Sequence, residues 1–334
     1  MSEEPLKFYQ TDTFTVGNRL LPPAERSVQA SRGRTNSLDC GHRACQGCGE
    51  ALGARYAVDA AMRASNNQLV CVNATGCLEV FSTPFPESSW KIPWLHSLFG
   101  NAPAVADGVA AGLRALGRPA RVLAQGGDGG TVDIGFGSLS GMFERNSDVL
   151  YICYDNQAYM NTGIQRSSAT PEAARTATTQ AVGEAPGNPP GTGKFLPEIA
   201  MAHHIPYVAT ASVSNLHDLE HKVSYAMSLS GARYIHVLVP CPLGWGFDPC
   251  ETILMARLAV ESGLFPLFEA EHGRLTRSTP LRRQVPVDRY LERQKRFAHL
   301  FAEGADPGVR ARIQQQADEQ IKTWNLTEED GHDH

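Results

Sequence analysis

The sequence predicts an α/β fold built on a doubly wound, mostly parallel sheet, and two observations carry this prediction. From Gly41 onward, short apolar runs alternate with longer segments of helical periodicity. The chain has 334 residues, 42% of them hydrophobic and 19% charged, which is enough to bury a large core without metals or disulfides. We expect an N-terminal arm over 1–40, the α/β domain over 41–250 and a helical docking extension over 251–334.

The individual elements follow from two periodicities in the sequence. Apolar runs bounded by turn residues predict strands over 69–72, 121–125, 149–154, 206–211 and 234–239. Apolar residues at three- and four-residue spacing predict helices over 51–64, 102–116, 136–144, 198–202 and 216–227. In the extension we expect helices over 252–262 and 288–302. The stretch 167–195, rich in Ala, Thr, Gly and Pro, is too long for an ordinary connection and predicts a functional or interface loop.

The composition excludes several classes of function. Lys and Arg total 30 against 35 Asp and Glu, and the formal net charge of −5 argues against nucleic-acid binding. No apolar stretch approaches the roughly 18 residues needed to span a bilayer, and the first residues lack the basic and apolar regions of a signal peptide. We therefore expect a cytoplasmic protein. In a reducing compartment, the cysteines indicate metal ligation or redox chemistry rather than disulfides.

Four of the cysteines are placed where a metal site could form. Cys45 and Cys48 make a C-x-x-C pair in a turn that also contains two glycines. Cys77 and Cys241 each follow a predicted strand, so both are expected at the carboxyl edge of the sheet. Four thiolates suit a structural zinc ion and a 4Fe-4S cluster equally, and the spacing leaves both open.

The other four cysteines carry less information. Cys71 and Cys153 lie inside apolar strand runs, where cysteine packs as a small buried hydrophobic residue. Cys40 and Cys250 have no assigned role. The metal prediction therefore rests on the other four alone.

A glycine-rich turn around Asp128 follows the predicted strand 121–125, and Asn156 follows the predicted strand 149–154. The ends of neighbouring parallel strands meet at one edge of a sheet, so the two polar side chains should emerge together. A carboxylate and an amide oxygen, beside glycines and a helix N-terminus, suit Mg²⁺ bound to a diphosphate. A tight turn without a ligand is the alternative for the glycines alone.

Five segments occur in the same order as in the β subunits of pyruvate:ferredoxin oxidoreductases, the pyruvate synthases. They are GHRACQGCGE, NATGCLEV, GGDGGTVDIG, DNQAYMNTGIQRSS and VPC. Over residues 41–300 the chain therefore resembles this family of thiamine-diphosphate-binding 2-oxoacid:ferredoxin oxidoreductases. The resemblance implies a domain of the thiamine-diphosphate-binding, pyrophosphate type that also carries a 4Fe-4S cluster.

The resemblance assigns roles to individual residues. The implied cluster ligands are Cys45, Cys48, Cys77 and Cys241. The implied Mg²⁺ ligands are Asp128, Asn156 and the carbonyl of Ala158. Cofactor contacts are implied at Glu50, Cys77, Gly127, Asp128, Gly129, Gly130, Asn156, Gln157, Ala158, Tyr159, Met160 and Asn161. Among these, Asn161 resembles the active-site asparagine, placed to hydrogen-bond the substrate.

The implied reaction is the reversible, coenzyme A-dependent oxidative decarboxylation of pyruvate to acetyl-CoA and CO₂, an anaerobic reaction whose electrons pass through the cluster to ferredoxin. The implied partners are an α subunit that completes the active site, and γ and ferredoxin-like δ subunits. Another 2-oxo acid, such as phenylglyoxylate or 2-oxoisovalerate, stays open as the substrate. So does a function of another class, a non-catalytic iron–sulfur electron-transfer subunit.

Overall fold

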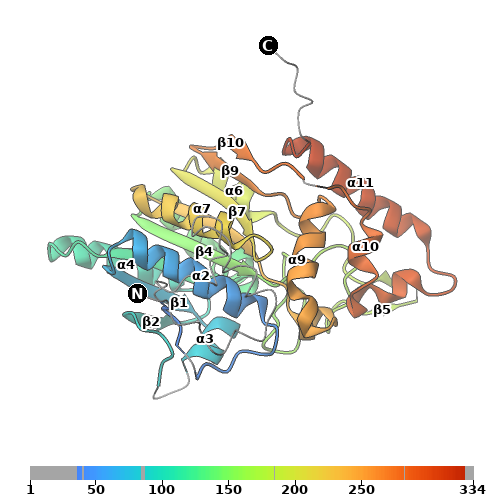
Figure 1. Ribbon diagram of the computed structural model, residues 1–334, viewed down its shortest axis with the longest axis horizontal. Coiled ribbons are helices and arrows are strands. Elements are labelled where there is room, and N and C mark those ends of the chain that lie inside the picture. Colours follow the sequence, from blue (N-terminus) through green and yellow to red (C-terminus); the bar gives the residue numbers. More distant parts are fainter. Residues whose placement is uncertain (1–35, 40, 84–86, 184, 282, 328–334) are drawn as a thin grey trace, which may run out of the picture. The chain divides into compact units, whose positions relative to one another are not determined.

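An eight-stranded sheet forms the centre of the described part of the chain (Figure 1). The structure is a computed structural model that describes residues 36–327 apart from 40, 84–86, 184 and 282. The strand order is β10-β9-β7-β8-β4-β3-β1-β2; only β9 and β10 run antiparallel to their neighbours. The strands are β1 (Leu69–Ala74), β2 (Trp94–Ser97), β3 (Arg121–Gly127), β4 (Val149–Asp155), β7 (Tyr207–Ser212), β8 (Arg233–Leu238), β9 (Phe268–Glu271) and β10 (Arg274–Ser278). The doubly wound, mostly parallel sheet is confirmed.

Helices connect these strands, and a short antiparallel pair, β5 (Ala181–Val182) and β6 (Ala185–Pro186), lies outside the main sheet. The α-helices are α2 (Gly49–Ala64), α3 (Cys77–Ser82), α4 (Ala102–Ala115), α5 (Phe136–Glu144), α6 (Leu196–Ala202), α7 (Leu216–Ser228), α8 (Pro242–Trp245), α9 (Thr252–Glu261), α10 (Asp288–Leu291) and α11 (Pro307–Thr323). A π-helical turn occupies Gly129–Ile134, and 3₁₀ segments occupy Pro249–Glu251 and Lys295–Phe301.

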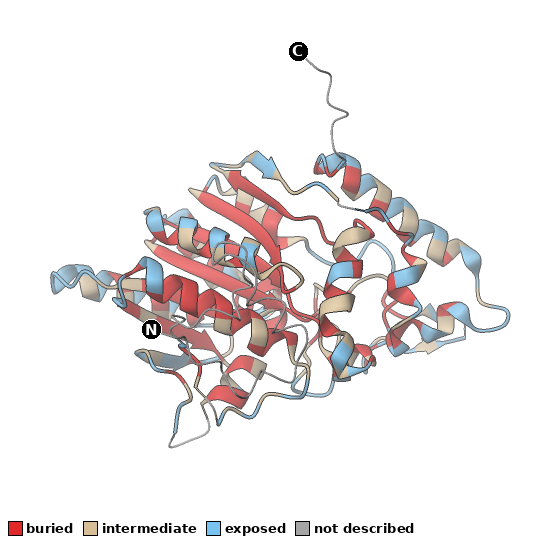
Figure 2. Ribbon diagram, in the orientation of Figure 1, coloured by how far each residue is buried: buried red, intermediate tan, exposed pale blue. Residues whose placement is uncertain are grey.

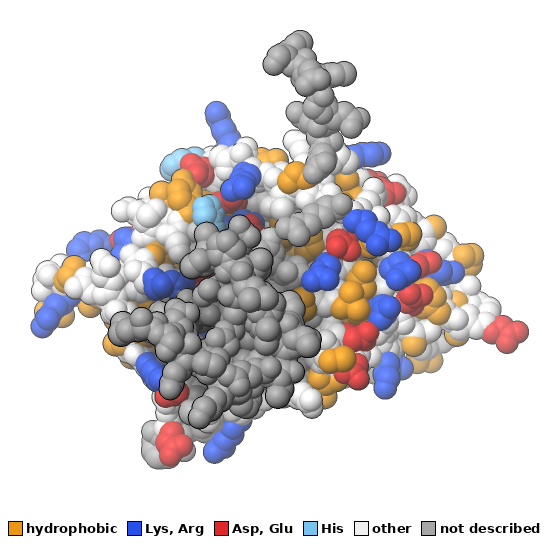
Figure 3. Space-filling model, viewed as in Figure 1, with side chains coloured by type: hydrophobic (Ala, Val, Ile, Leu, Met, Phe, Trp, Pro, Cys, Tyr) orange, Lys and Arg blue, Asp and Glu red, His pale blue; other side chains and the backbone are white. Residues whose placement is uncertain are grey.

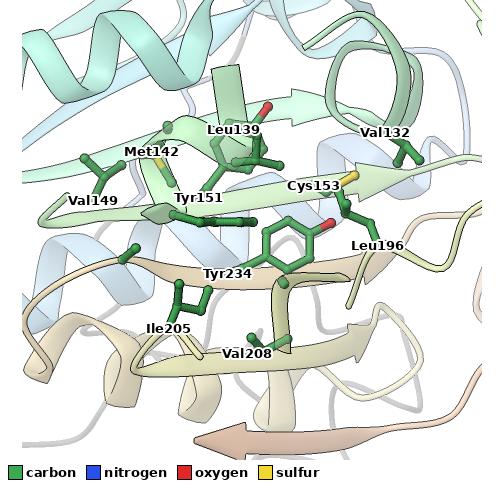
Figure 4. Close-up of a cluster of buried hydrophobic side chains, with 14 of the residues drawn as sticks. Val132, Leu139, Met142, Val149, Tyr151, Cys153, Leu196, Ile205, Val208 and Tyr234 are labelled. Atoms are coloured by element: carbon green, nitrogen blue, oxygen red, sulfur yellow. The ribbon is translucent and has the colours of Figure 1, made fainter. Parts of the chain in front are cut away.

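The core lies on both faces of the sheet, because helices cover each face (Figure 1). α2 and α7 pack on each other over one face, and α4, α5 and α6 pack over the other. Figure 2 shows the central strands buried along their length, as parallel strands covered on both sides must be. Figure 4 shows Cys153 among Leu139, Leu196 and Tyr234 in the α5–α6 layer. Cys71 and Cys153 are both fully buried, which confirms them as core residues.

Each predicted strand is present, and β1, β3, β4 and β7 extend past their predicted carboxyl ends. β3 continues to Gly127 and β4 continues to Asp155, so Asp128 and Asn156 are the next residues along the chain. The helix expected after the glycine-rich turn begins as the π-helical turn and continues as α5. The fold therefore delivers both polar residues to the same edge of the sheet.

The prediction of one helix over 288–302 is wrong, because the segment is broken at Gln294. This residue is extended (φ −116°, ψ 122°) between α10 and the following 3₁₀ segment. Its buried amide donates to the Tyr290 carbonyl at 2.7 Å, and its Oε1 accepts from Arg296 Nε at 2.8 Å. Buried side-chain hydrogen bonds within the segment thus interrupt the helix at Gln294, and Arg296 enters the interior.

The chain after β8 builds a second hydrophobic cluster. This cluster contains residues of α9, α10, α11 and the 3₁₀ segment Lys295–Phe301. They pack with Trp245 of α8 and with Ala173 and Ala174 of the loop 167–195. Residues from Ser37 onward form one compact unit, and most of the predicted arm, with Cys40, lies outside the described residues. Over α9 to α11 the visible surface intersperses basic and acidic side chains (Figure 3). No helix in the described ranges is long and apolar enough to cross a membrane.

Candidate cofactor and metal site

The carboxyl ends of four adjacent strands carry the candidate site. In the sheet order β8, β4, β3 and β1, the residues that follow these strands include Cys241, Asn156, Asp128 and Cys77. Ligands of open α/β sheets collect at this edge. The structure therefore brings together the polar residues that the sequence places at strand ends.

Asp128 is a buried carboxylate at the end of β3. Its side chain is 1% exposed, and its Oδ2 accepts a hydrogen bond of 2.5 Å from the Ser167 hydroxyl. Burial raises the pKa of Asp128 well above its ordinary range, and the charge of Asp155 raises it further. A buried carboxylate beside another is costly unless a cation offsets the negative charge. The electrostatics of this position therefore suit a bound cation.

Asn156 supplies a free acceptor on the adjacent strand end. Its Nδ2 donates to Glu50 Oε2 at 3.2 Å, but its buried Oδ1 has no hydrogen-bond partner among the described residues. Gln157 then takes a left-handed conformation (φ +66°), and the buried Ala158 follows. A buried carboxylate with an unpartnered amide oxygen is the donor set that Mg²⁺ takes in proteins. Asp128, Asn156 and Ala158 therefore fit a magnesium site.

Glycines let other groups approach the turn closely. A Cβ added to Gly129 would lie 2.6 Å from the Tyr159 ring, and one added to Gly130 would lie 3.1 Å from the Phe99 carbonyl oxygen. The Thr131 hydroxyl donates to the Gly127 carbonyl at 2.7 Å and fixes the turn. Backbone N–H groups at such a turn are the usual diphosphate donors. This arrangement fits a bound diphosphate.

Replacing Gly129 by alanine is expected to displace Tyr159 and weaken cofactor retention. The new Cβ clashes with the ring, whose hydroxyl donates to Asp133 Oδ2 at 3.1 Å, and overpacking of this kind costs about 1–3 kcal/mol. Thermal unfolding and bound thiamine diphosphate measure the two effects. The control is Gly137→Ala in α5, where an added Cβ meets nothing within 4 Å and should stabilise the helix slightly. Equal behaviour of the two variants would contradict the prediction.

Three of the predicted cysteine ligands lie at helix N-termini. Cys48 is the N-cap of α2, and its Sγ accepts from Ala51 N at 3.4 Å. Cys241 is the N-cap of α8, and its Sγ accepts from Gly244 N at 3.3 Å. Cys77 is the first residue of α3. Helix N-termini and amide hydrogen bonds favour thiolates, as metal ligation requires.

The four thiols lie close enough to influence one another. Burial raises the pKa of Cys77, and the charges of Glu50, Cys241 and Cys48 raise it further. Burial is also the main cause that raises the pKa of Cys48 to about 12, and the exposed Cys45 acts on the pKa of Cys241. In the described part of the chain, no three His, Cys, Asp or Glu side chains are arranged so that they could hold one metal ion. The thiols are therefore neighbours without forming a closed single-ion site.

Glu50 joins the cysteine group to the magnesium group. It lies two residues after Cys48, is 3% exposed, and accepts hydrogen bonds from Asn156 Nδ2 and from the backbone N–H of Leu78, the residue after Cys77. Burial raises the pKa of Glu50 to about 7. One buried carboxyl thus contacts both predicted sites, which places them side by side.

The remaining predicted contacts follow β4. Met160 packs against Gly244 of α8, beside Cys241, and Tyr159 lies over Gly129. Asn161 is exposed, so a substrate can reach it from outside the fold. The unassigned Cys250 is exposed and lines a surface pocket with Cys45 and Cys48.

Sequence reasoning missed the residues that brace the glycine-rich turn. Ser167 donates to Asp128, and Lys194 Nζ lies 3.2 Å from Asp133 Oδ1 and 3.1 Å from Ser168 Oγ. Ser167, Ser168 and Lys194 all belong to the loop predicted as functional, 167–195, whereas Tyr159, the other partner of Asp133, precedes it. The composition of that loop signalled a role, but no local pattern showed which side chains would reach the turn.

Comparisons with known proteins agree with this geometry. The model of the C-terminal TPP-binding domain of thiamine pyrophosphate enzymes matches residues 74–237. Pyruvate synthase subunit PorB of Methanosarcina barkeri is 50% identical over 292 residues, which cover 86% of this chain and 97% of that one. Subunit PorB of Pyrococcus furiosus is 44% identical (78% and 86% covered), and ketoisovalerate oxidoreductase subunit VorB of Pyrococcus abyssi is 40% identical (79% and 86%).

A solved structure supports the fold alone. The 2-oxoglutarate:ferredoxin oxidoreductase of Magnetococcus marinus, with 2-oxoglutarate, coenzyme A and succinyl-CoA bound, aligns with a TM-score of 0.50 at 21% identity, covering 66% of this chain and 79% of that one.

The matched family domain includes Asp128 and Asn156, and the PorB matches extend over most of the chain. The resemblance seen in the motifs is confirmed: the chain belongs to the pyruvate synthase subunit PorB family of thiamine pyrophosphate enzymes.

Proposed function

We propose that the chain is the cofactor-binding β subunit of a pyruvate:ferredoxin oxidoreductase. This enzyme converts pyruvate and coenzyme A to acetyl-CoA and CO₂ and passes the electrons through a 4Fe-4S cluster to ferredoxin. The observation that carries the proposal is the joining of two sites by Glu50: the Asp128–Asn156 donor set on one side and Cys48 and Cys77 on the other. The relatives named pyruvate synthase add the substrate.

The chain's own residues bind and orient in this proposal. Asp128, Asn156 and the Ala158 carbonyl hold Mg²⁺, and the backbone of Gly127 to Gly130 holds the diphosphate. When bound, thiamine diphosphate supplies the carbanion chemistry that cleavage of a 2-oxo acid requires. Asn161, exposed at the mouth of the site, donates a hydrogen bond to the substrate. The Glu50 carboxylate keeps Asn156 oriented, and it also contacts the backbone of Leu78, next to Cys77.

The cysteine group is proposed to hold the cluster that accepts the electrons. Cys45, Cys48, Cys77 and Cys241 are the proposed ligands of the 4Fe-4S cluster. The Cys77 thiol feels the charges of Glu50 and Asp128, so the cysteine group adjoins the magnesium donors. A cluster held by these cysteines would supply an electron acceptor close to the cofactor-binding residues, which would explain why this chain carries both groups.

Anoxic purification of the native complex tests the proposal. We expect coenzyme A-dependent dye reduction with pyruvate, together with bound thiamine diphosphate and iron. A preference for 2-oxoisovalerate or phenylglyoxylate would instead assign the alternative substrate; the VorB relatives, at 39–40% identity, are less similar than the PorB relatives at 43–50%. A complex with iron but without thiamine diphosphate would show an electron-transfer subunit and reject the proposal.

The α subunit is proposed to dock at the carboxyl edge of the sheet. Leu98 follows β2 and is 74% exposed, and Ile134 ends the π-helical turn and is 62% exposed. A Cβ added to Gly100 would lie 2.8 Å from Ile134 Cγ2, so the two segments are adjacent. Exposed apolar side chains beside a cofactor site mark a protein interface.

Replacing Ile134 by glutamate is expected to weaken assembly with the α subunit, because a charge would be buried in an apolar contact. Co-purification of the subunits and analytical ultracentrifugation measure the loss. Leu116→Glu is the matched control: Leu116 is 75% exposed at the C-terminal end of α4, before β3 and so at the opposite edge. Assembly of the Ile134 variant at the level of the control would reject this docking face.

A further inference from the structure

Arg296 is a buried cation to which the site described so far gives no role. It follows the break at Gln294, and its side chain enters the interior with 4% of its surface exposed. The guanidinium carbon lies 3.9 Å from the centre of the Trp245 ring and 4.9 Å from the centre of the Phe297 ring. Burial lowers the pKa of Arg296 to about 10, which shows how poorly this position solvates a charge. A buried charge at such a position needs specific partners.

The hydrogen bonds of Arg296 lead to the loop after β4. Its Nη2 donates to Gln157 Oε1 at 2.7 Å and to the Tyr290 hydroxyl at 3.2 Å. Gln157 is the left-handed residue between Asn156 and Ala158. A left-handed conformation is unfavourable for a residue with a Cβ, and it persists only where the surroundings enforce it.

Two further contacts enforce the conformation of Gln157. Its backbone N–H donates to Asp155 Oδ1 at 2.8 Å, and its carbonyl accepts from the Thr170 hydroxyl at 2.8 Å. Arg296 holds the side-chain Oε1, so the backbone N–H, the carbonyl and the side-chain oxygen of Gln157 each have a partner. Of these partners, only Arg296 comes from the segment after residue 250, and it is the one that carries a positive charge.

Arg296 also reaches Asn156 through Trp245. The fully buried Trp245 indole donates from Nε1 to the Asn156 carbonyl at 2.7 Å, and the guanidinium stacks on that ring. Trp245 ends α8, whose N-cap is Cys241. The adjacent Lys295 N–H donates to the Gly246 carbonyl at 3.2 Å and holds the 3₁₀ segment against the end of α8.

We propose that Arg296 is a positioning residue of the metal site: by hydrogen-bonding Gln157 and stacking on Trp245, it holds Asn156 and Ala158 in the orientation that binds the divalent cation. This inference rests on the proposed function, because it assumes that these residues ligate the ion. It gives the C-terminal segment a role inside the active subunit. Outer partners of this kind orient ligands, and their loss costs about 10- to 100-fold in metal affinity.

The test is a set of variants in the whole anoxic complex. Arg296→Lys keeps the charge but loses the planar stack and the forked donors. Gln157→Met keeps the volume but removes the acceptor, and it tests the same contact if the arginine variant fails to assemble. The matched control is Arg310→Lys in α11, whose guanidinium lies 4.9 Å from the centre of the Phe301 ring and pairs with Asp288 at 2.7 Å instead of with Gln157.

After removal of Mg²⁺ and thiamine diphosphate, Mn²⁺ binding is measured by electron paramagnetic resonance at a fixed thiamine diphosphate concentration. We expect Mn²⁺ affinity about 10- to 100-fold weaker in the Arg296 and Gln157 variants, with unchanged iron content, and wild-type affinity in the control. Wild-type affinity in the Arg296 or Gln157 variant would overturn the inference. So would an equal loss in the control. A wild-type complex that binds no Mn²⁺ with thiamine diphosphate would overturn the proposed function itself.

Discussion

Replacing Asp128 by asparagine is expected to abolish retention of Mg²⁺ and thiamine diphosphate while leaving the fold and the cysteine group intact. Asparagine has the same shape and keeps an acceptor for the Ser167 hydroxyl, so the turn is preserved. The negative charge that the cation requires is lost. We expect Mg²⁺ affinity to fall by at least about 100-fold, beyond the upper end of the effect of losing a residue that only orients a ligand. Equilibrium dialysis of thiamine diphosphate with Mg²⁺ measures it.

Without the cofactor, the same Asp128→Asn substitution is expected to stabilise the fold. Burial raises the pKa of Asp128 above the unfolded value of 3.8, so folding favours the protonated carboxyl. As the pH rises above the unfolded value, the folded state of the cofactor-free protein loses stability relative to the unfolded state. Asp128→Asn removes this loss, and the cofactor-free variant should unfold at a higher temperature than wild type near neutral pH.

A buried carboxylate far from the site provides the control. Glu269 of β9 is 7% exposed and accepts from the Tyr207 hydroxyl at 2.6 Å. Glu269→Gln should retain thiamine diphosphate as wild type does. If Asp128→Asn also retains the cofactor and turns over normally in the full complex, Asp128 is not a magnesium ligand.

The parts of the fold that the sequence predicted are those fixed by local pattern. The apolar run at 149–154 is typical of a buried central strand, and the structure has β4 there. Asp128 and Asn156 are placed by the strands that they directly follow, β3 and β4. The break at Gln294 depends on hydrogen bonds to Tyr290 and Arg296 in the folded interior, which helical periodicity does not contain. The short edge strands β2 and β10 are half exposed, and so they lack a buried run.

The candidate site divides in the same way. Cys45, Cys48 and Asp128 lie in compact motifs, where spacing alone is informative. The contact between Glu50 and Asn156 joins residues 106 positions apart, and that between Gln157 and Arg296 joins residues 139 apart. Contacts of that range arise from packing of whole elements. A single sequence therefore predicts the ligands of this site better than the residues that hold them in place.

Replacing Cys48 by serine is expected to remove the cluster while leaving the thiamine diphosphate site occupied. Serine is a favoured N-cap, so it can accept the hydrogen bond from Ala51 N and keep α2 in place. It does not supply the thiolate that iron needs. We expect loss of bound iron and sulfide, and ferredoxin or dye reduction lowered by at least about 100-fold, since a ligand is lost and not merely its partner.

Cys250→Ser is the matched control, because Cys250 is an exposed cysteine on the same surface pocket and lies outside the proposed ligand set. It should keep iron, sulfide and activity. Metal analysis of the wild type decides the chemistry: iron with sulfide identifies the cluster, whereas zinc would make the four cysteines structural. If Cys48→Ser retains its iron, the ligand set is wrong. If it loses iron and thiamine diphosphate together, the link through Glu50 couples the two sites more tightly than independent binding allows.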